Sequence, residues 1–457
     1  MSRSPRSIAL QILERPSSAY DFVNDDELPD KRDRALVKEL VNGVWRWKRL
    51  LDHYIAAFCD RPSSKISTRI MNALRIGVYQ LVFMGMPSYA AVDSIVRCMR
   101  TGGEKGFVNA VLRSISRNMG HIELPSIDAR PLEYAGLRYS YPDWIVRRYV
   151  GSFGFEDSLS LLKAQNTPPV LTLRVNEMKC DRDTLLELLR GEGYCAEPGS
   201  LPFSVKVSKG RSVEQFPGYR EGLFVVQDEA AMLPALALKP KPGEVVWDVC
   251  AAPGGKSTQL AEMVFPDGLV VASDISSERT CMIAESCSRL GITNVVPCVL
   301  DATNEDEILA TFSREGLPTV YDKILVDAPC SGLGTIGGNP DIKWQRQESE
   351  IKRLADLQKR ILETISRFLK PGGSIVYSTC TLTSEENEGV WYEFIERSGF
   401  SMEYLSPADW SMAGLRLPQS AQKPGCIYML PHIHKTDGFF VAKGSKNSPG
   451  VSGLYHL

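Results

Sequence analysis

Apolar residues recur every three or four positions through the first part of the chain, a spacing that places them on one side of an α-helix. This pattern runs through three segments: Leu36, Leu40, Val44, Trp47, Leu51 and Ile55, then Val92, Ile95, Val96 and Met99, then Val108, Val111, Leu112 and Ile115. We therefore predict an all-α domain over residues 1–125. A helical connector is expected over residues 126–167, where the spacing becomes irregular.

The spacing of apolar and polar residues changes at two further points along the chain. Residues 170–175 alternate as a strand does, which predicts a small α+β domain of RRM-like form over residues 168–240. From residue 241, short apolar runs alternate with helical segments, which indicates an α/β fold with a mostly parallel, doubly wound sheet over residues 241–443. Residues 444–457 are rich in Ser, Gly and Asn and are predicted to form a flexible tail.

Local signals predict details of the α/β region. Ser276 is placed to cap a helix, and Thr383 with Glu386 forms a capping-box pattern that is expected to open another helix. His432 and His434 stand two residues apart and are expected on one face of an edge strand.

Composition excludes several classes of protein. Hydrophobic residues make up 43% of the 457 residues and charged residues 24%, as in globular rather than disordered chains. The longest charge-free stretch, residues 76–92, is shorter than the about 20 residues of a membrane span and contains polar positions. The apolar run at the N-terminus ends too early for a secretory signal. We therefore expect a cytoplasmic protein without a membrane partner.

Charge is distributed unevenly although the net charge is only -2. Residues 1–120 hold 19 Lys+Arg against 12 Asp+Glu, so the rest of the chain is acidic. A basic module of this kind indicates contact with a polyanion, and the alternative is a solvated helical surface.

A Gly-rich turn stands between an apolar strand and a helix at residues 248–258, with the sequence DVCAAPGGKST. Its Gly-Lys-Ser resembles a phosphate-binding loop, but the Gly that such a loop requires five positions earlier is Cys250. This difference excludes an ATPase. Asp274 ends the next strand, where doubly wound folds hold ribose hydroxyls. The pattern predicts an adenosine-type ligand without phosphates, and the alternative is a turn that binds nothing.

Two cysteines follow strands of the predicted sheet, Cys330 in residues 327–332 (DAPCSG) and Cys380 in residues 378–381 (STCT). Because ligands bind at the carboxyl ends of parallel strands, we expect both thiols at the edge that holds the Gly-rich turn. Lys256 is a candidate cation for activating a thiol. Six other cysteines are expected to be packing residues: Cys59, Cys98, Cys195, Cys281, Cys287 and Cys298.

The eleven cysteines include no C-x-x-C pair and show no regular spacing, which excludes a disulfide framework and a zinc ribbon. The histidines form no ligand set, and no metal is expected.

These motifs, together with residues 339–344 (NPDIKW) and Tyr377 before the second cysteine, closely resemble the Sun family of RNA cytosine carbon-5 methyltransferases, in particular its bacterial 16S ribosomal RNA branch. Residues 107–113 (FVNAVLR) are similar to the NusB-type RNA-binding domain that this family carries in bacteria. The resemblance implies a seven-stranded, Rossmann-like methyltransferase domain preceded by the NusB-like and α+β domains. It covers nearly the whole chain.

The resemblance also implies a chemistry. Carbon 5 of cytosine is a poor nucleophile, and Cys380 would activate the ring by covalent addition at carbon 6. Cys330 would help to release the product, while Asp327 and Lys256 would polarise the base through hydrogen bonds. The cofactor would be S-adenosyl-L-methionine, held by Cys250, Ala251, Ala252, Pro253, Gly254, Gly255, Lys256, Asp274, Asp301 and Asp327.

The implied partner is 16S ribosomal RNA, with the target cytosine single-stranded or flipped out of its stack. We expect the protein to act as a monomer. A DNA cytosine methyltransferase is an alternative, because Pro329-Cys330 mimics the nucleophile motif of those enzymes. A second alternative is an RNA-binding assembly factor that keeps an inactive methyltransferase fold.

Overall fold

The computed structural model describes residues 4–15, 28, 30–119, 123–208, 212–405, 422–423 and 425–448. The chain divides into two compact units. The first contains Met1–Asn166 and Gly338–Arg346, and the second contains Thr167–Gly337 and Gln347–Leu457.

The first unit is helical, as the spacing of its apolar residues predicts. Its helices are α1 (Pro5–Glu14), α2 (Lys31–Ala57), η1 (Ser63–Lys65), α3 (Thr68–Val82), α4 (Ser88–Val96), α5 (Gly102–Asn118), α6 (Pro131–Arg138), α7 (Asp143–Phe153), α8 (Phe155–Gln165) and α14 (Ile342–Gln345). Leu40, Val44 and Leu112 are among the buried residues that form its core. Helix α5 begins with a capping box in which the side chains of Thr101 and Glu104 bind each other's backbone N–H groups.

A short segment from the middle of the chain also belongs to the helical unit. Lys343 on α14 is fully buried there, and its ammonium donates hydrogen bonds to the carbonyl oxygens of Arg46 (2.7 Å) and Ser140 (2.9 Å) and to Oδ1 of Asn166 (3.2 Å). Burial, and then the nearby charge of Arg46, holds the pKa of Lys343 well below its ordinary value. The NPDIKW motif at residues 339–344 is therefore held within the helical unit by the buried Lys343.

The second unit begins with a small antiparallel sheet. Its strands are β1 (Leu171–Val175), β2 (Cys195–Pro198), β3 (Ser204–Ser208) and β4 (Phe224–Val226), in the order β2-β3-β1-β4, with helix α9 (Arg182–Gly191) between β1 and β2 and the turn η3 (Val213–Gln215) after β3. Leu173, Leu185 and Phe224 are buried between sheet and helix. The predicted α+β domain thus contains one four-stranded sheet.

The large sheet follows with its middle strands parallel. Its strands are β5 (Val245–Asp248), β6 (Leu269–Asp274), β7 (Val295–Val299), β8 (Tyr321–Asp327), β9 (Leu369–Thr379), β12 (Cys426–Met429) and β13 (Phe439–Lys446), in the order β12-β13-β9-β8-β5-β6-β7. Strand β13 is antiparallel to both β9 and β12. These seven strands are the predicted Rossmann-like core, and the short strands β10 (Phe400–Glu403) and β11 (Gln422–Lys423) add to it beside β13 and β12.

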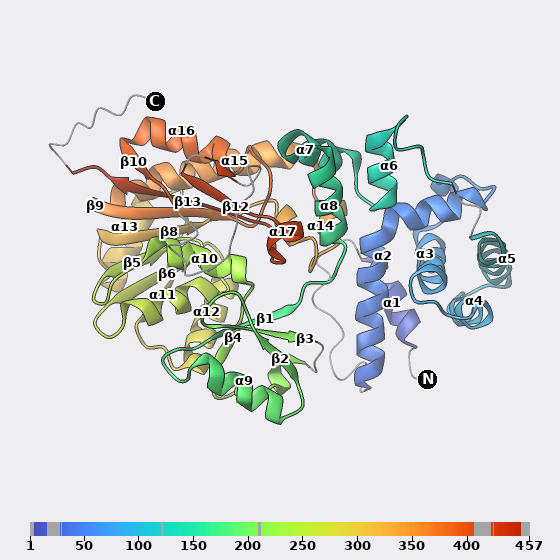
Figure 1. The fold of residues 1–457 in the computed structure, drawn as a ribbon, viewed down its shortest axis with the longest axis horizontal. Helices are drawn as coiled ribbons and strands as arrows, with labels where there is room; N and C mark the ends of the chain where they lie inside the picture. Colours follow the sequence, from blue (N-terminus) through green and yellow to red (C-terminus); the bar gives the residue numbers. More distant parts are fainter. Residues whose placement is uncertain are drawn as a thin grey trace. The chain divides into compact units, whose positions relative to one another are not determined.

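Helices cover both faces of the large sheet, with α15 and α16 on one face and α10, α11 and α12 on the other (Figure 1). The helices and turns of this region are α10 (Glu229–Leu238), α11 (Gly255–Val264), α12 (Ser277–Leu290), α13 (Glu305–Glu315), η4 (Leu333–Thr335), α15 (Glu348–Ile365), η5 (Ser366–Phe368), α16 (Glu388–Ser398) and α17 (Pro431–His434). Helix α10 packs on β8, β9 and β13, so it belongs to this core although it precedes residue 241.

Some local predictions hold and others are wrong. Ser276 caps α12 by accepting the N–H of Arg279. Thr383 and Glu386 do not open a helix, because α16 begins only at Glu388 and the Thr383 hydroxyl donates to the Glu386 carboxylate instead.

Other corrections concern the end of the chain and the cysteines. His432 and His434 lie in the short helix α17 rather than on a strand, since Pro431 occupies a first-turn position that suits a helix. Cys195 and Cys281 are exposed and are not packing residues. Strand β13 continues to Lys446, past the expected start of the tail, and residues 449–457 of that tail lie outside the described residues.

Candidate active site

The carboxyl ends of five parallel strands bring the predicted site residues to one edge of the large sheet. The Gly-rich turn follows β5, Asp274 ends β6, Asp301 follows β7, Asp327 ends β8, and Cys380 follows β9. Strands β8 and β9 are direct neighbours, with Asp327 paired to Ser378. This placement follows from the parallel topology that the sequence predicts.

The Gly-rich turn reverses the chain between β5 and α11. Gly254 has φ of 103°, a left-handed conformation that disfavours any residue with a Cβ, and a Cβ there would lie 3.3 Å from the backbone of Ile283. The N–H of Ala251 donates to the carbonyl of Ser273 on β6, at 2.8 Å. Cys250, Ala252, Pro253 and Gly255 complete the turn. Its backbone is therefore held in position before any ligand binds.

Lys256 on the first turn of α11 forms an ion pair with Asp327, at 2.5 Å between Nζ and Oδ2. The hydroxyl of Ser378 donates to the other oxygen, Oδ1, at 2.8 Å. Burial is the largest single effect and would lower the pKa of Lys256. The charge of Asp327, its hydrogen bond and the charge of Asp248 together outweigh burial, so the pKa lies above its ordinary value. The site thus contains a fixed cation beside a carboxylate with both oxygens occupied.

The two predicted thiols face each other across the ends of β8 and β9. The sulfur atoms of Cys330 and Cys380 lie 3.3 Å apart. The hydrogen bond to Cys380, and then burial, raises the pKa of Cys330 well above its ordinary value. Cys330 is therefore held as a thiol next to the sulfur of Cys380, and Lys256 is near enough to Cys380 to interact with its charge.

Gly334 joins the two cysteine loops through its backbone. Its N–H donates to the carbonyl of Cys380 and its own carbonyl accepts from Gly438, both at 2.9 Å. A Cβ on Gly334 would lie 1.9 Å from the Gly438 oxygen and 2.7 Å from the Cys380 oxygen. Glycine, which has no Cβ, is therefore the only residue that fits at position 334.

The two remaining predicted carboxylates have local partners. Asp274 is buried, and it accepts the N–H of Ser276 at 3.1 Å and pairs with Arg279 at 3.4 Å. Asp301 accepts the N–H and hydroxyl of Thr303, at 2.8 and 2.7 Å. Asp274 thus stands where the ribose of an adenosine ligand is expected, while a role of Asp301 toward the ligand stays a prediction.

Glu386 is a site residue whose role the sequence does not reveal. Its carboxylate is fully buried and accepts hydrogen bonds from Ser331, which follows Cys330, and from Thr383, which comes after Cys380. The capping-box spacing singles out Glu386 and Thr383 but assigns them to a helix end. The partner Ser331 is 55 positions away, and no local pattern indicates that distance.

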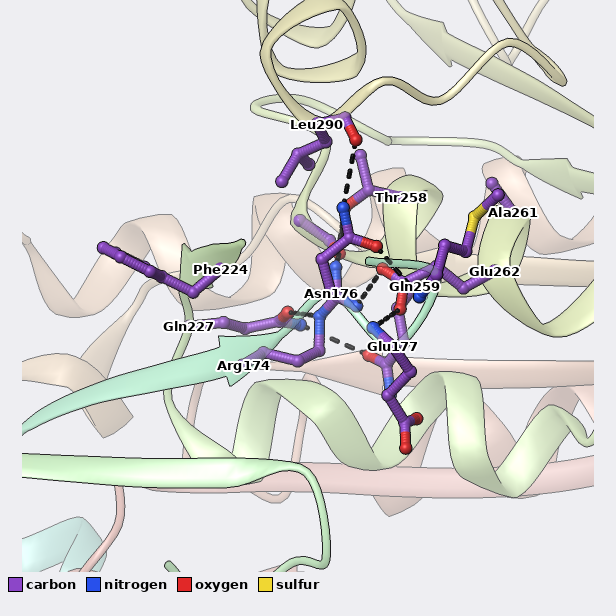
Figure 2. A network of polar contacts seen from close by, with 12 residues as sticks. Arg174, Asn176, Glu177, Phe224, Gln227, Thr258, Gln259, Ala261, Glu262 and Leu290 are labelled. Atoms are coloured by element: carbon purple, nitrogen blue, oxygen red, sulfur yellow. Dashed lines mark hydrogen bonds and ion pairs between the residues drawn. The ribbon is translucent and has the colours of Figure 1, made fainter. Parts of the chain in front are cut away.

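A second network that the sequence does not indicate connects the small sheet with α11, the helix that follows the Gly-rich turn (Figure 2). Arg174 on β1 is 1% exposed and donates to Gln227 (2.8 Å), Thr258 (2.9 Å) and Glu262 (2.5 Å), the last two on α11. It also reaches the carbonyl of Gly255, at 3.4 Å. Hydrogen bonds from Arg174 therefore connect the small sheet to α11, the helix that begins at the Gly-rich turn.

Two further findings concern a metal site and a membrane-spanning helix. Within the described ranges, no three His, Cys, Asp or Glu side chains gather in a way that could hold a metal ion. The same part of the chain contains no helix that is both long and apolar enough to cross a membrane.

The strand order, the Gly-rich turn after β5 and the carboxylate at the end of β6 define a Rossmann-like methyltransferase with S-adenosyl-L-methionine as its cofactor. Family models agree with this class. The model described as 16S rRNA methyltransferase RsmB/F matches residues 235–444, that of the NusB family matches 3–117, and that of the RsmF/B-like ferredoxin-like domain matches 141–214.

Relatives match along the whole chain. The probable ribosomal RNA small subunit methyltransferase B of Bacillus subtilis is 37% identical, over 97% of this chain and 99% of its own. Ribosomal RNA small subunit methyltransferase B of Pasteurella multocida is 34% identical, over 95% and 94%. The chain therefore belongs to the family of ribosomal RNA small subunit methyltransferases B.

Solved structures are similar as well. That of PH0851 has a TM-score of 0.77 at 26% identity, over 97% of this chain and 98% of its own. A methyltransferase homologue from Pyrococcus horikoshii has a TM-score of 0.58 at 32% identity, over 69% and 99%. NSun6 from Pyrococcus horikoshii, solved with SFG, has a TM-score of 0.56 at 25% identity, over 66% and 97%.

Proposed function

We propose that this protein methylates carbon 5 of a cytosine in 16S ribosomal RNA, through a covalent adduct between Cys380 and carbon 6 of the base. The observation that carries the proposal is the pair of thiols 3.3 Å apart beside the Lys256–Asp327 ion pair. A methyltransferase that acts at an oxygen or an exocyclic nitrogen would need no nucleophilic thiol. The names of the relatives support the small-subunit RNA as substrate.

The residues of the turn fit the cofactor. A ribose needs a carboxylate at the end of β6 and a backbone that a ligand can approach closely, and Asp274 and the Gly254–Gly255 turn meet these needs. Cys250, Ala251, Ala252, Pro253, Lys256, Asp301 and Asp327 complete the proposed set. When bound, S-adenosyl-L-methionine supplies the methyl group that carbon 5 receives.

The chain's own residues do the rest of the chemistry. The Cys380 sulfur forms a bond to carbon 6, and the electrons of the carbon 5–carbon 6 double bond move toward carbon 5. Lys256 lies close enough to Cys380 for the two side chains to interact electrostatically. Asp327 and Lys256 orient and polarise the base. After carbon 5 has been methylated, a base takes its proton, and the electrons of that bond re-form the carbon 5–carbon 6 double bond. The sulfur of Cys380 leaves carbon 6 with the electrons of the bond that breaks.

Cys330 suits the release step better than the attack. Its raised pKa keeps it as a thiol, so it can donate a hydrogen bond to the sulfur of Cys380 as that sulfur leaves the base. A DNA-type enzyme would use Cys330 as the nucleophile, and a protonated thiol attacks poorly.

We propose that the protein works in the cytoplasm as a monomer.

The test is to trap the adduct on RNA that contains 5-fluorocytidine, which blocks the loss of the carbon 5 substituent. We expect wild type and Cys330→Ala to form a covalent complex and Cys380→Ala to form none. The opposite result would assign the attack to Cys330. Tritiated methyl transfer to unmodified small-subunit RNA separates an enzyme from an RNA-binding assembly factor, which would incorporate no label.

Bisulfite mapping of ribosomal RNA with and without the gene identifies the substrate. An unchanged pattern at every small-subunit cytosine would contradict the proposal that 16S ribosomal RNA is the substrate.

A further inference from the structure

Glu386 bridges the two loops that carry the thiols, and we propose that it is a positioning residue that sets the distance between Cys330 and Cys380. The proposal rests on the proposed function, because it gives the spacing of these thiols a purpose. Glu386 itself is fully buried behind the two loops and acts through them.

Both oxygens of the Glu386 carboxylate accept hydrogen bonds from the first loop. The backbone N–H of Ser331 donates to Oε1 at 2.8 Å, and the Ser331 hydroxyl donates to Oε2 at 2.6 Å. Ser331 directly follows Cys330 in the chain. The carboxylate therefore fixes the backbone next to the first thiol.

The second loop is bonded to the same carboxylate. The hydroxyl of Thr383 donates to Oε2 at 2.7 Å, and the hydroxyls of Ser331 and Thr381 lie 2.7 Å apart. Thr381 directly follows Cys380. A single buried group thus binds residues on both sides of the gap between the sulfur atoms.

Helix α15 and strand β9 hold Glu386 in place. The amide nitrogen of Gln358 donates to Oε1 of Glu386 at 3.2 Å and to the carbonyl of Pro329 at 3.0 Å. The hydroxyl of Tyr377 lies 2.5 Å from the Glu386 carbonyl and 3.1 Å from Oε1 of Gln358. The carboxylate is therefore a fixed point against which both loops are set.

The chemistry of these contacts favours a carboxylate. The groups that meet the Glu386 side chain all donate to it, and a carboxylate accepts at both oxygens. A glutamine of the same shape keeps an acceptor for the Ser331 N–H and for Gln358 only if its NH₂ group takes the position of Oε2. The hydroxyls of Ser331 and Thr383 would then have to turn from donors into acceptors, and the contact between the hydroxyls of Ser331 and Thr381 would have to rearrange with them. We expect this rearrangement to loosen both loops.

The experiment measures the thiol spacing directly with dibromobimane, a reagent that becomes strongly fluorescent when it bridges two neighbouring thiols. Subtracting the signals of Cys330→Ser and Cys380→Ser from that of wild type isolates this pair from the other nine cysteines. We expect Glu386→Gln to lower the pair-dependent bridging rate at least fivefold. The dissociation constant for S-adenosyl-L-methionine should stay within twofold of wild type, because the Gly-rich turn is untouched.

Two further variants complete the design. Glu385→Gln changes the adjacent, exposed carboxylate and should bridge at the wild-type rate. Thr383→Val removes one donor without changing the shape of the side chain, so it should give a smaller loss and serves if Glu386→Gln does not fold. Wild-type bridging by both Glu386→Gln and Thr383→Val would overturn the proposal, and so would a wild-type protein without pair-dependent signal.

The outcome is separable from that of the proposed function. If wild type bridges but forms no adduct with fluorocytidine RNA, the chemistry assigned to Cys380 is wrong while the spacing role of Glu386 is still measured. If the adduct forms at equal rates in wild type and Glu386→Gln, the proposed function stands and the positioning role fails.

Discussion

The Lys256 ammonium and the Asp327 carboxylate lie 2.5 Å apart and join the helix that follows the Gly-rich turn to the strand that leads to Cys330. The pair is mostly shielded from solvent, with 13% and 24% of the two side chains exposed. Loss of Asp327 would remove the charge that raises the pKa of Lys256, and burial would then lower it. The ion pair therefore determines over which pH range the site keeps its cation.

Asp327→Asn should lower the rate of methyl transfer by about 10²–10³-fold, since the charge that orients Lys256 is lost. The pKa of Lys256 should fall, so the remaining rate of the variant should decline at a lower pH than the rate of wild type, in which the ammonium stays charged. The pH–rate profiles of both proteins test this. Parallel profiles would contradict it.

Ser378→Ala is the matched control for that variant. It removes a neutral hydrogen bond to Asp327 and leaves the ion pair with Lys256 intact. We expect a smaller loss of rate and a pH profile like that of wild type.

The buried pair of Arg174 and Glu262 predicts strong coupling between the small sheet and α11. Arg174→Met alone should lower the free energy of unfolding by about 3–5 kcal/mol, because it leaves the Glu262 charge buried without its partner. The double variant Arg174→Met, Glu262→Met should lose less, since no buried charge remains. Urea unfolding of wild type, Arg174→Met, Glu262→Met and the double variant measures this, and additive losses would contradict the coupling.

The same double variant should weaken binding of S-adenosyl-L-methionine, because Arg174 also reaches the carbonyl of Gly255 in the turn. Titration calorimetry on the folded double variant measures the change. Wild-type affinity would show that the turn does not need Arg174.

Gly334→Ala should destabilise the protein and abolish methyl transfer, because its Cβ would overlap the carbonyl oxygen of Gly438. Overpacking of this kind costs about 1–3 kcal/mol or more. Gly106→Ala in α5 is the control, since a Cβ there meets no described atom outside its own helix within 4 Å. It should raise stability by about 0.5–1 kcal/mol, as expected when alanine replaces glycine in a helix. Thermal unfolding separates the two variants, and equal effects would refute the steric argument.

Asp248 predicts how stability depends on pH. Burial raises its pKa from the ordinary 3.8 to about 7, against the opposing hydrogen bond from Ser257. The folded protein therefore binds this proton more tightly than the unfolded chain does, and the resulting stability is lost as pH rises from about 4 to 7. Relative to Asp248→Asn, wild type should lose up to about 1.4 kcal/mol per pH unit in that window. Urea unfolding at pH 5, 6, 7 and 8 tests this, and a constant difference would contradict it.

Much of the site could be predicted because it depends on local order along the chain. Asp274, Asp327 and Cys380 each follow an apolar strand, and parallel strands end at the same edge of the sheet. The turn at Gly254 is likewise specified by its own residues. Patterns of this kind need no knowledge of how distant segments pack.

The supporting contacts could not be predicted because their partners lie far apart in the sequence. Arg174 and Glu262 are 88 positions apart, and Ser331 and Glu386 are 55 apart. Glu386 carries a recognisable local pattern with Thr383, but tertiary hydrogen bonds use both side chains for another purpose. Hydrophobic periodicity does not report on such polar contacts, since it records only which face of an element is buried.

The anchoring of Lys343 has a consequence for how this protein can be divided and inherited. The chain leaves the methyltransferase region after Gly337, contributes residues Gly338–Arg346 to the helical unit, and returns at Gln347. A gene fragment that starts at Thr167 would therefore encode a lysine whose three acceptors are all missing. The helical unit and this short insertion must consequently be exchanged together in any chimaera, and mutations at Lys343 and around Asn166 should be selected as one group.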